Sequence, residues 1–274
     1  MSADTTRLPE YAATQAALHR AFRRELHRAV RTVPLRPGAA VLDVPCGDGF
    51  FTALLARRMY PFGKVTAADR SDAYLTAARR SVAGLDRAAT VDFVKSDAYQ
   101  LPFDDSSFDV VWCAQSFISI GDPVAALREM RRVIRSGGRV AVLEDDDLHR
   151  VVLNWPVGLE LDVRRAMAEV SRERYGARAA LSPGRRVREF FRNAGLEPLG
   201  KKTIVADRQV PFDPAVRRFL RLFSRDTRAS LAGHLAPEQF AAVARATDPD
   251  DPGFILNCPD AGLTYLTTLF LAGR

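Results

Sequence analysis

The sequence predicts an α/β fold in which helices cover both faces of a doubly wound, mostly parallel sheet. Five short apolar runs of strand length, each bounded by turn residues, occupy residues 39–44, 63–69, 91–97, 108–114 and 138–144. Segments with helical spacing of apolar residues lie between them, at 50–60, 71–85 and 122–138. Such alternation requires right-handed crossovers, which place parallel strands side by side.

The remaining segments extend this core into a single domain of 274 residues. Apolar residues at three- and four-residue spacing predict a helix over residues 16–33, within an N-terminal helical cap at 1–36. The core at 37–146 is followed by a helix at 183–196 and by strands six and seven at 201–210 and 262–274. Helical insertions are expected after strands five and six, at 147–182 and 211–250.

Two of these boundaries rest on single residues. Asp122 is expected to cap the helix at 122–138, and Gly137 or Gly138 is expected to end it. The insertions are interpreted as a lid over an acceptor site, and their aliphatic and aromatic content suggests an apolar acceptor. Ordinary core packing explains that content equally well.

Composition favours a globular enzyme of the cytoplasm. Hydrophobic residues make up 47% and charged residues 27%, and no stretch approaches the roughly 18 apolar residues of a membrane span. The start lacks a basic flank followed by an apolar run, which disfavours secretion. Three widely spaced cysteines indicate neither a disulfide framework nor a metal site. The net charge of +7 is only weak support for nucleic-acid binding, because most basic residues are arginines, a bias typical of GC-rich coding sequence.

The most informative string is VLDVPCGDGFF at residues 41–51, a strand that ends in a glycine-containing turn and opens into a helix. Gly47 and Gly49 allow a ligand to approach the backbone, and the helix start offers unpaired N–H groups. The alternative is a tight turn in another kind of α/β protein. A dinucleotide fingerprint fits poorly, because Thr52 stands where a third glycine is required. Asp43 inside the strand is costly unless it supports a loop or faces a cation.

Asp43, Pro45, Gly47 and Gly49 resemble the first motif of the class I S-adenosylmethionine-dependent methyltransferases, in particular the small-molecule enzymes of the type 11 group. The resemblance covers residues 39–144 and implies a Rossmann-like sheet of seven strands. It also implies S-adenosylmethionine as cofactor and S-adenosylhomocysteine as product. Pro45 replaces the family's first glycine and removes one backbone donor.

The resemblance extends to the ends of the later strands. It implies that Asp69 accepts the ribose hydroxyls, that Asp97 accepts from the adenine amine and that Ala98 donates to adenine through its backbone. Gln115 follows the fourth motif, beside the expected methyl position, and Tyr11 either folds over the methionine part or packs. The cofactor-binding set is therefore Tyr11, Asp43, Pro45, Gly47, Gly49, Asp69, Arg70, Asp97, Ala98 and Gln115.

A catalytic base is harder to find. The sulfonium already activates the methyl group, so a base is needed only if the acceptor keeps its proton. The family's histidine after strand four is missing, since SFISIGD stands there. His149, next to the four carboxylates at 144–147, is the candidate base, and a solvated acidic loop is the alternative. His19, His27 and His234 are expected to be structural.

The sequence thus predicts methyl transfer to oxygen, nitrogen or carbon of a small molecule, such as an apolar or aromatic product of secondary metabolism. A monomer or homodimer is expected, without metal, nucleic acid or membrane. Alternatives are an RNA or protein methyltransferase, a cyclase or sensor that binds the same cofactor, and an NAD-dependent oxidoreductase. A nucleic-acid target is disfavoured, because strand four is followed by neither an Asn/Asp-Pro-Pro-aromatic string nor a Pro-Cys nucleophile.

Overall fold

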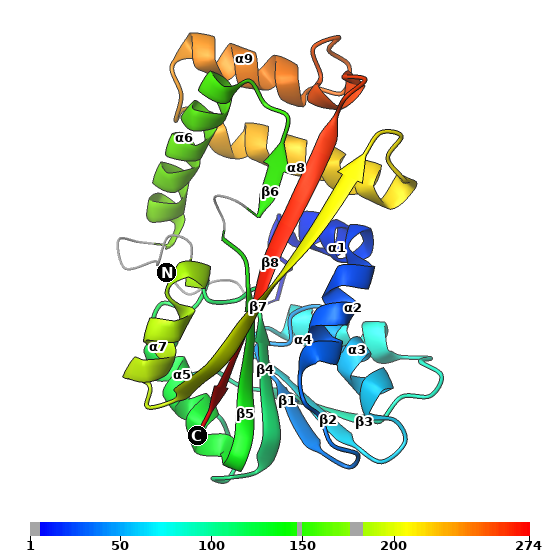
Figure 1. Ribbon diagram of the computed structural model, residues 1–274, viewed down its shortest axis with the longest axis vertical. Coiled ribbons are helices and arrows are strands. Elements are labelled where there is room, and N and C mark those ends of the chain that lie inside the picture. The colour runs from blue at the N-terminus through cyan, green and yellow to red at the C-terminus, as the bar shows by residue number, and fades with distance from the viewer. Residues whose placement is uncertain (1–5, 147–149, 176–182) are drawn as a thin grey trace.

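The computed structural model describes residues 6–146, 150–175 and 183–274, which fold around one sheet (Figure 1). In this part of the chain the sheet has eight strands in the order β3-β2-β1-β4-β5-β8-β6, and β7 pairs with β8 as well. The strands are β1 (Ala40–Asp43), β2 (Lys64–Asp69), β3 (Thr90–Lys95), β4 (Phe108–Ala114), β5 (Ile134–Glu144), β6 (Val151–Leu153), β7 (Glu197–Gln209) and β8 (Gly262–Gly273).

The first five strands pair in parallel, and β8 runs antiparallel to β5, β6 and β7. The α/β class and the mostly parallel sheet are therefore confirmed. Strand β1 lies between β2 and β4, so the chain reverses its winding direction there, and ligands of open α/β sheets bind beside such a point.

Helices cover both faces of the sheet. The helices of the described chain are α1 (Ala12–Ala21), α2 (Arg23–Thr32), α3 (Phe50–Met59), α4 (Asp72–Val82), α5 (Pro123–Val133), α6 (Val157–Tyr175), α7 (Val187–Asn193), α8 (Pro214–Leu231) and α9 (Pro237–Thr247). Trp112 and Val41 point into the core beneath α2 and α3, whereas Val111 and Leu42 point into the core beneath α5 and α7. Because both faces are buried, these strands are apolar at successive positions.

Three sequence expectations differ from the structure. The predicted N-terminal helix is broken at Phe22, which has φ −114° and is completely buried, so that α1 and α2 are separate helices. The helix expected to end at Gly137 or Gly138 ends at Val133, because Ile134 is already extended and pairs with Phe108 of β4. The insertion expected to be helical includes the short strand β6, which pairs with β8, so the described sheet has eight strands where seven were expected.

Helices α6, α8 and α9 contact one another and form a layer beyond the carboxyl ends of the parallel strands, into which β7 and β8 extend (Figure 1). We call these three the lid helices. Helix α8 packs against α1, which connects the lid helices with the N-terminal segment. Among the described residues, none of the helices is both long and apolar enough to cross a bilayer.

Candidate functional site

A cavity of about 950 Å³ lies at the carboxyl ends of the parallel strands, between the sheet, α1 and the lid helices α6 and α8. The turns after β1, β2, β3, β4 and β5 all contribute to its wall. Eight of the residues that the sequence assigned to cofactor binding line it: Tyr11, Pro45, Gly47, Asp69, Arg70, Asp97, Ala98 and Gln115. The topology therefore gathers residues from five separate strand ends around one space.

The glycine turn after β1 combines an open side with a tightly packed side. Gly47 and Gly49 have φ of +52° and +79°, a region in which side chains with a Cβ are strained. A Cβ on Gly47 would have none of the described atoms within 4 Å, whereas one on Gly49 would lie 2.6 Å from Cα of Ala78 in α4. Gly47 thus leaves the cavity wall open, and Gly49, which is not among the residues lining the cavity, lets α4 approach the start of α3.

Asp43 lies behind this turn and is not among the residues that line the cavity. Its side chain is 1% exposed, and its Oδ2 accepts a hydrogen bond from the hydroxyl of Thr52 in α3 at 2.5 Å. Burial raises the pKa of Asp43 to about 7, although the Thr52 bond opposes that shift. Of the two roles considered for this carboxyl group, the geometry favours support of the loop over contact with a ligand cation.

Asp69 ends β2 and holds the glycine turn with one oxygen. Its Oδ2 accepts the N–H of Gly47 at 3.0 Å, and its Oδ1 accepts the N–H of Ser71 at 2.9 Å. Burial raises the pKa of Asp69, and these two backbone donors oppose that shift. Since a carboxylate oxygen can accept more than one hydrogen bond, both oxygens keep capacity for a diol presented in the cavity.

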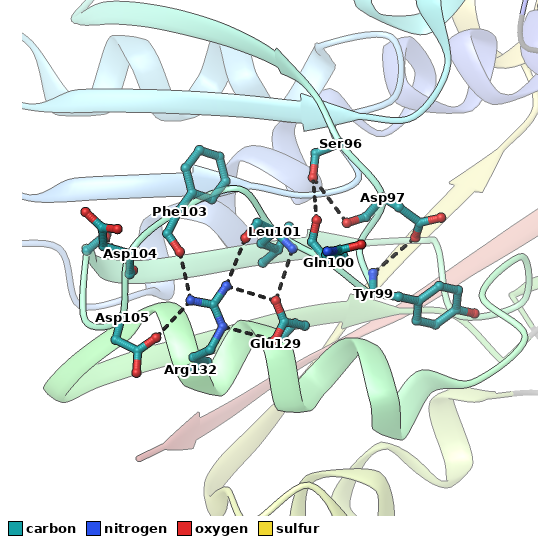
Figure 2. Close-up of polar contacts among 11 residues, drawn as sticks. Ser96, Asp97, Tyr99, Gln100, Leu101, Phe103, Asp104, Asp105, Glu129 and Arg132 are labelled. Atoms are coloured by element: carbon teal, nitrogen blue, oxygen red, sulfur yellow. Dashed lines mark hydrogen bonds and ion pairs between the residues drawn. The ribbon is translucent and has the colours of Figure 1, made fainter.

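The loop after β3 forms the next part of the wall, with Ser96, Asp97, Ala98 and Tyr99 on the cavity (Figure 2). Oδ1 of Asp97 accepts the N–H of Tyr99 at 3.0 Å, which curls the loop. The hydroxyl of Ser96 lies 3.1 Å from the carbonyl oxygen of Asp97 and 3.3 Å from that of Gln100. These local bonds keep the exposed Asp97 and the buried Ala98 at the cavity edge.

Two residues of α5 hold the same loop from outside the cavity (Figure 2). Arg132 donates to the carbonyl oxygens of Leu101 and Phe103 at 2.9 and 2.8 Å, and Glu129 accepts the N–H of Leu101 at 3.0 Å. Arg132 also donates to both oxygens of Glu129, and this bond lowers the pKa of the Glu129 carboxyl. We call this pair the α5 clamp.

Gln115 connects four elements at the opposite side of the cavity. It follows β4 with a φ of +52°, which is uncommon for a residue with a side chain and is typical of functional sites. Its Oε1 accepts from Gln15 and His19 of α1, at 2.6 and 2.9 Å. Its Nε2 donates to Oδ2 of Asp145 at 3.2 Å and to the hydroxyl of Tyr265 in β8 at 3.3 Å.

His19 lines the cavity, although the sequence predicts a structural role for it. Its ring stacks on Phe50 with centroids 4.3 Å apart. Its Nδ1 is buried, has no hydrogen-bond partner among the described residues and lies 3.9 Å from Oδ2 of Asp48. Burial lowers the pKa of His19, so the ring is neutral near pH 7. The available signal was the four-residue spacing of Gln15 and His19, which puts both on one face of α1.

Of the two remaining sequence candidates, Tyr11 lies among the described residues and His149 does not. Tyr11 lies at the start of α1 and lines the cavity, beside Tyr74 of α4. Burial raises the pKa of Tyr74, and its hydrogen bond with Tyr11 acts in the same direction. His149, the predicted base, lies outside the described residues. Asp145, from the same acidic string, is described, is 4% exposed and lines the cavity.

Comparison with known proteins agrees with this arrangement. Residues 42–142 match the family described as a methyltransferase domain. The chain is 41% identical over 110 residues to the ubiquinone/menaquinone biosynthesis C-methyltransferase of Idiomarina loihiensis, covering 40% of this chain and 44% of that protein. It is 36% identical over 126 residues to the demethylmenaquinone methyltransferase of Staphylococcus aureus, covering 46% of this chain and 50% of that protein. The chain therefore spans about half the length of these curated relatives.

Solved structures extend the likeness over most of the chain. A SAM-dependent methyltransferase from Methanosarcina mazei has a TM-score of 0.54 at 16% identity, covering 89% of this chain and 96% of that one. The [4+2]-cyclase SpnF has a TM-score of 0.52 at 21% identity, covering 96% and 94%. At these identities the likeness concerns the fold alone. The match to the methyltransferase domain is confined to residues 42–142, the part of the chain that also carries the motifs resembling class I S-adenosylmethionine-dependent methyltransferases.

Proposed function

We propose that this protein binds S-adenosylmethionine in the cavity and transfers its methyl group to a small-molecule acceptor, releasing S-adenosylhomocysteine. The observation that carries the proposal is the convergence of Gly47, Asp69 and Asp97, from three separate strand ends, on one cavity. A family domain over residues 42–142 supports the same conclusion independently.

The residues present fit an adenosyl ligand. Asp69 can accept a ribose diol with the lone pairs that Gly47 and Ser71 leave free. Asp97 uses only Oδ1 for the Tyr99 bond, so within the described chain its Oδ2 is available to an exocyclic amine. Gly47 leaves room for the methionine part above the start of α3.

The cavity is larger than this ligand requires. Its volume of about 950 Å³ is near the upper end of the roughly 300–1,000 Å³ that small-molecule sites occupy, which leaves space for an acceptor. Met167 and Val170 of α6 and Phe223 of α8 line the part under the lid helices. These side chains support an apolar or aromatic acceptor, and the quinone substrates named for the curated relatives have that character.

When bound, the sulfonium supplies a methyl group that is already activated. The chain's own task is then to hold the acceptor in line with that group and to exclude water. The lid helices provide the apolar cover, and the Gln115 network joins them through α1 to the strand ends. A role in secondary metabolism, a cytoplasmic location and a monomeric or homodimeric state stay predictions from the sequence.

The test combines binding with turnover. Calorimetric titration should show one S-adenosylhomocysteine per chain, and incubation with S-adenosylmethionine and metabolite extracts should yield a product heavier by one methyl group. Binding of the cofactor without accumulation of S-adenosylhomocysteine for any acceptor would instead indicate a sensor or a cyclase. Greater transfer to crude RNA or protein than to small molecules would contradict the proposed acceptor class.

A further inference from the structure

We propose that Asp145 is the catalytic base that takes the proton from a hydroxyl group of an aromatic acceptor, and that Gln115 is its positioning residue. The inference rests on the proposed methyl transfer and identifies the group that activates the acceptor. The proposed base is thus one of the four carboxylates at 144–147, in place of the neighbouring His149.

Asp145 is the first residue after β5, and its carboxyl group is buried yet lines the cavity. Its Oδ2 accepts from Nε2 of Gln115 at 3.2 Å, and its Oδ1 accepts from the hydroxyl of Tyr265 at 3.4 Å. Tyr265 is completely buried and stacks on Phe22, so this donor is held by the core. Each oxygen of Asp145 keeps a lone pair for an acceptor hydroxyl.

The orientation of the Gln115 amide is determined on both sides. Its oxygen accepts from Gln15 and His19, so its nitrogen must face Asp145. A reversed amide would bring two oxygens together at Asp145. The αL backbone of Gln115, whose N–H donates to the carbonyl oxygen of Leu143 at 2.7 Å, directs the side chain into this position.

Burial raises the pKa of Asp145, which is the direction that a base requires. Desolvation raises the pKa of Asp145, and the charge of Arg150 with the side-chain bonds from Thr267, Gln115 and Tyr265 opposes that shift. A general base works best when its pKa is close to the working pH, which an exposed aspartate does not achieve. The titratable groups described around Asp145 are Arg150, Tyr265 and His19, and the His19 ring is neutral near pH 7.

The apolar wall near Asp145 favours a neutral hydroxyl over an amine. Arg150 and Arg174 line the cavity together with the carboxyl groups of Glu144, Asp145 and Asp226, so the charges of this wall include both signs. The apolar side chains of Met167 and Phe223 disfavour burying an ammonium acceptor among them. A phenolic ring with its hydroxyl toward Asp145 satisfies both the apolar wall and the carboxylate.

The step is balanced without a further reactant. As the acceptor oxygen forms its bond to the methyl carbon, Asp145 takes the hydroxyl proton, and the carbon–sulfur electron pair remains on sulfur to give the neutral thioether. When a ring carbon attacks instead, the same deprotonation supplies the electron density, and the methylated carbon then loses its own proton to water while the oxygen regains one. Asp145 then releases its proton to water after product leaves.

The experiment uses the full chain with S-adenosylmethionine and three probes: catechol, hydroquinone and 4-nitrocatechol. Asp145→Asn should lower kcat with catechol at least 100-fold, in the range that general bases contribute, and should leave S-adenosylhomocysteine affinity within about twofold. The loss should be much smaller with 4-nitrocatechol, whose hydroxyl is already ionised at pH 8. Gln115→Leu should show the same difference between the two acceptors at a smaller amplitude.

The matched control is Asp207→Asn, which changes an exposed carboxyl group of β7 that accepts from Thr264. It should not alter any of these rates. A wild-type rate in Asp145→Asn, or an equal loss with both catechols, would overturn the proposal, because the second pattern is that of a structural residue. Absence of transfer to every probe while S-adenosylhomocysteine still binds would also overturn it. Failure of the wild type to bind S-adenosylhomocysteine would contradict the proposed function instead.

Discussion

Replacing Arg132 by alanine should weaken S-adenosylhomocysteine binding although Arg132 lies outside the cavity. Its guanidinium makes five hydrogen bonds, to the carbonyl oxygens of Leu101 and Phe103, to Asp105 and twice to Glu129 (Figure 2). The α5 clamp therefore fixes the loop that carries Asp97 and Ala98. Without the clamp, the loop is less ordered in the free protein, and S-adenosylhomocysteine binding must then bear the free-energy cost of ordering it.

The structure bounds the size of this effect. The Arg132 side chain is 31% exposed and that of Asp105 is 69% exposed, so the Asp105 ion pair contributes little. The bonds to two carbonyl oxygens and to Glu129 remain, and together they stabilise the fold by about 2–3 kcal/mol. If about half of that reappears as the cost of ordering the loop, S-adenosylhomocysteine affinity falls roughly tenfold, or about 1.4 kcal/mol.

Calorimetry and denaturant unfolding measure the two effects separately. Arg131→Ala is the control, because Arg131 lies on the same helix and donates to the carbonyl oxygen of Gly195, away from the cavity loop. Arg132→Lys should recover part of the affinity, since a lysine keeps the charge but not the planar fork. If Arg132→Ala lost stability but kept affinity within twofold, the clamp would be shown not to position the loop.

Three further changes test other parts of the site. Asp69→Ala should weaken S-adenosylhomocysteine binding by about 1–3 kcal/mol through loss of charge-assisted bonds, and unchanged calorimetric affinity would remove Asp69 from the site. Asp43 has a folded pKa of about 7 against an ordinary 3.8, so its contribution to stability is present below pH 4 and is lost as pH rises to 7. The slope of unfolding free energy over that window should therefore be less negative in Asp43→Asn, and parallel curves would contradict the assignment. Gly49→Ala should lose at least about 2 kcal/mol, because its φ is +79° and its Cβ would meet Ala78; a wild-type denaturant midpoint would refute that packing.

Local patterns predicted the core of the fold well. The run at 108–114 coincides with β4, and the turn at Gly47 lies where a strand-to-helix glycine turn was expected. Both can be read from short stretches of sequence, because parallel strands buried on both faces are continuously apolar and because glycine adopts positive φ without strain. The same reasoning put Asp69 and Asp97 on one cavity, because carboxyl ends of parallel strands meet at one edge.

What the sequence did not predict depends on distant partners. Ile134 leaves its helix because Phe108, far away in the chain, offers it a strand partner. Gln115 forms hydrogen bonds with His19, 96 positions away in the chain, and with Tyr265, 150 positions away. The sequence around Gln115 therefore contains no sign of this network. Asp43 was interpretable in two ways from sequence, and only the contact with Thr52 favours loop support.

The most direct test of the account is a pair of calorimetric titrations of the wild-type chain, one with S-adenosylhomocysteine and one with NADH. We expect one binding site for S-adenosylhomocysteine, weakened in Asp69→Ala, and no heat of binding with NADH. Binding of NADH with none of S-adenosylhomocysteine would show that the strand ends form a site for a different nucleotide and would contradict the proposed activity.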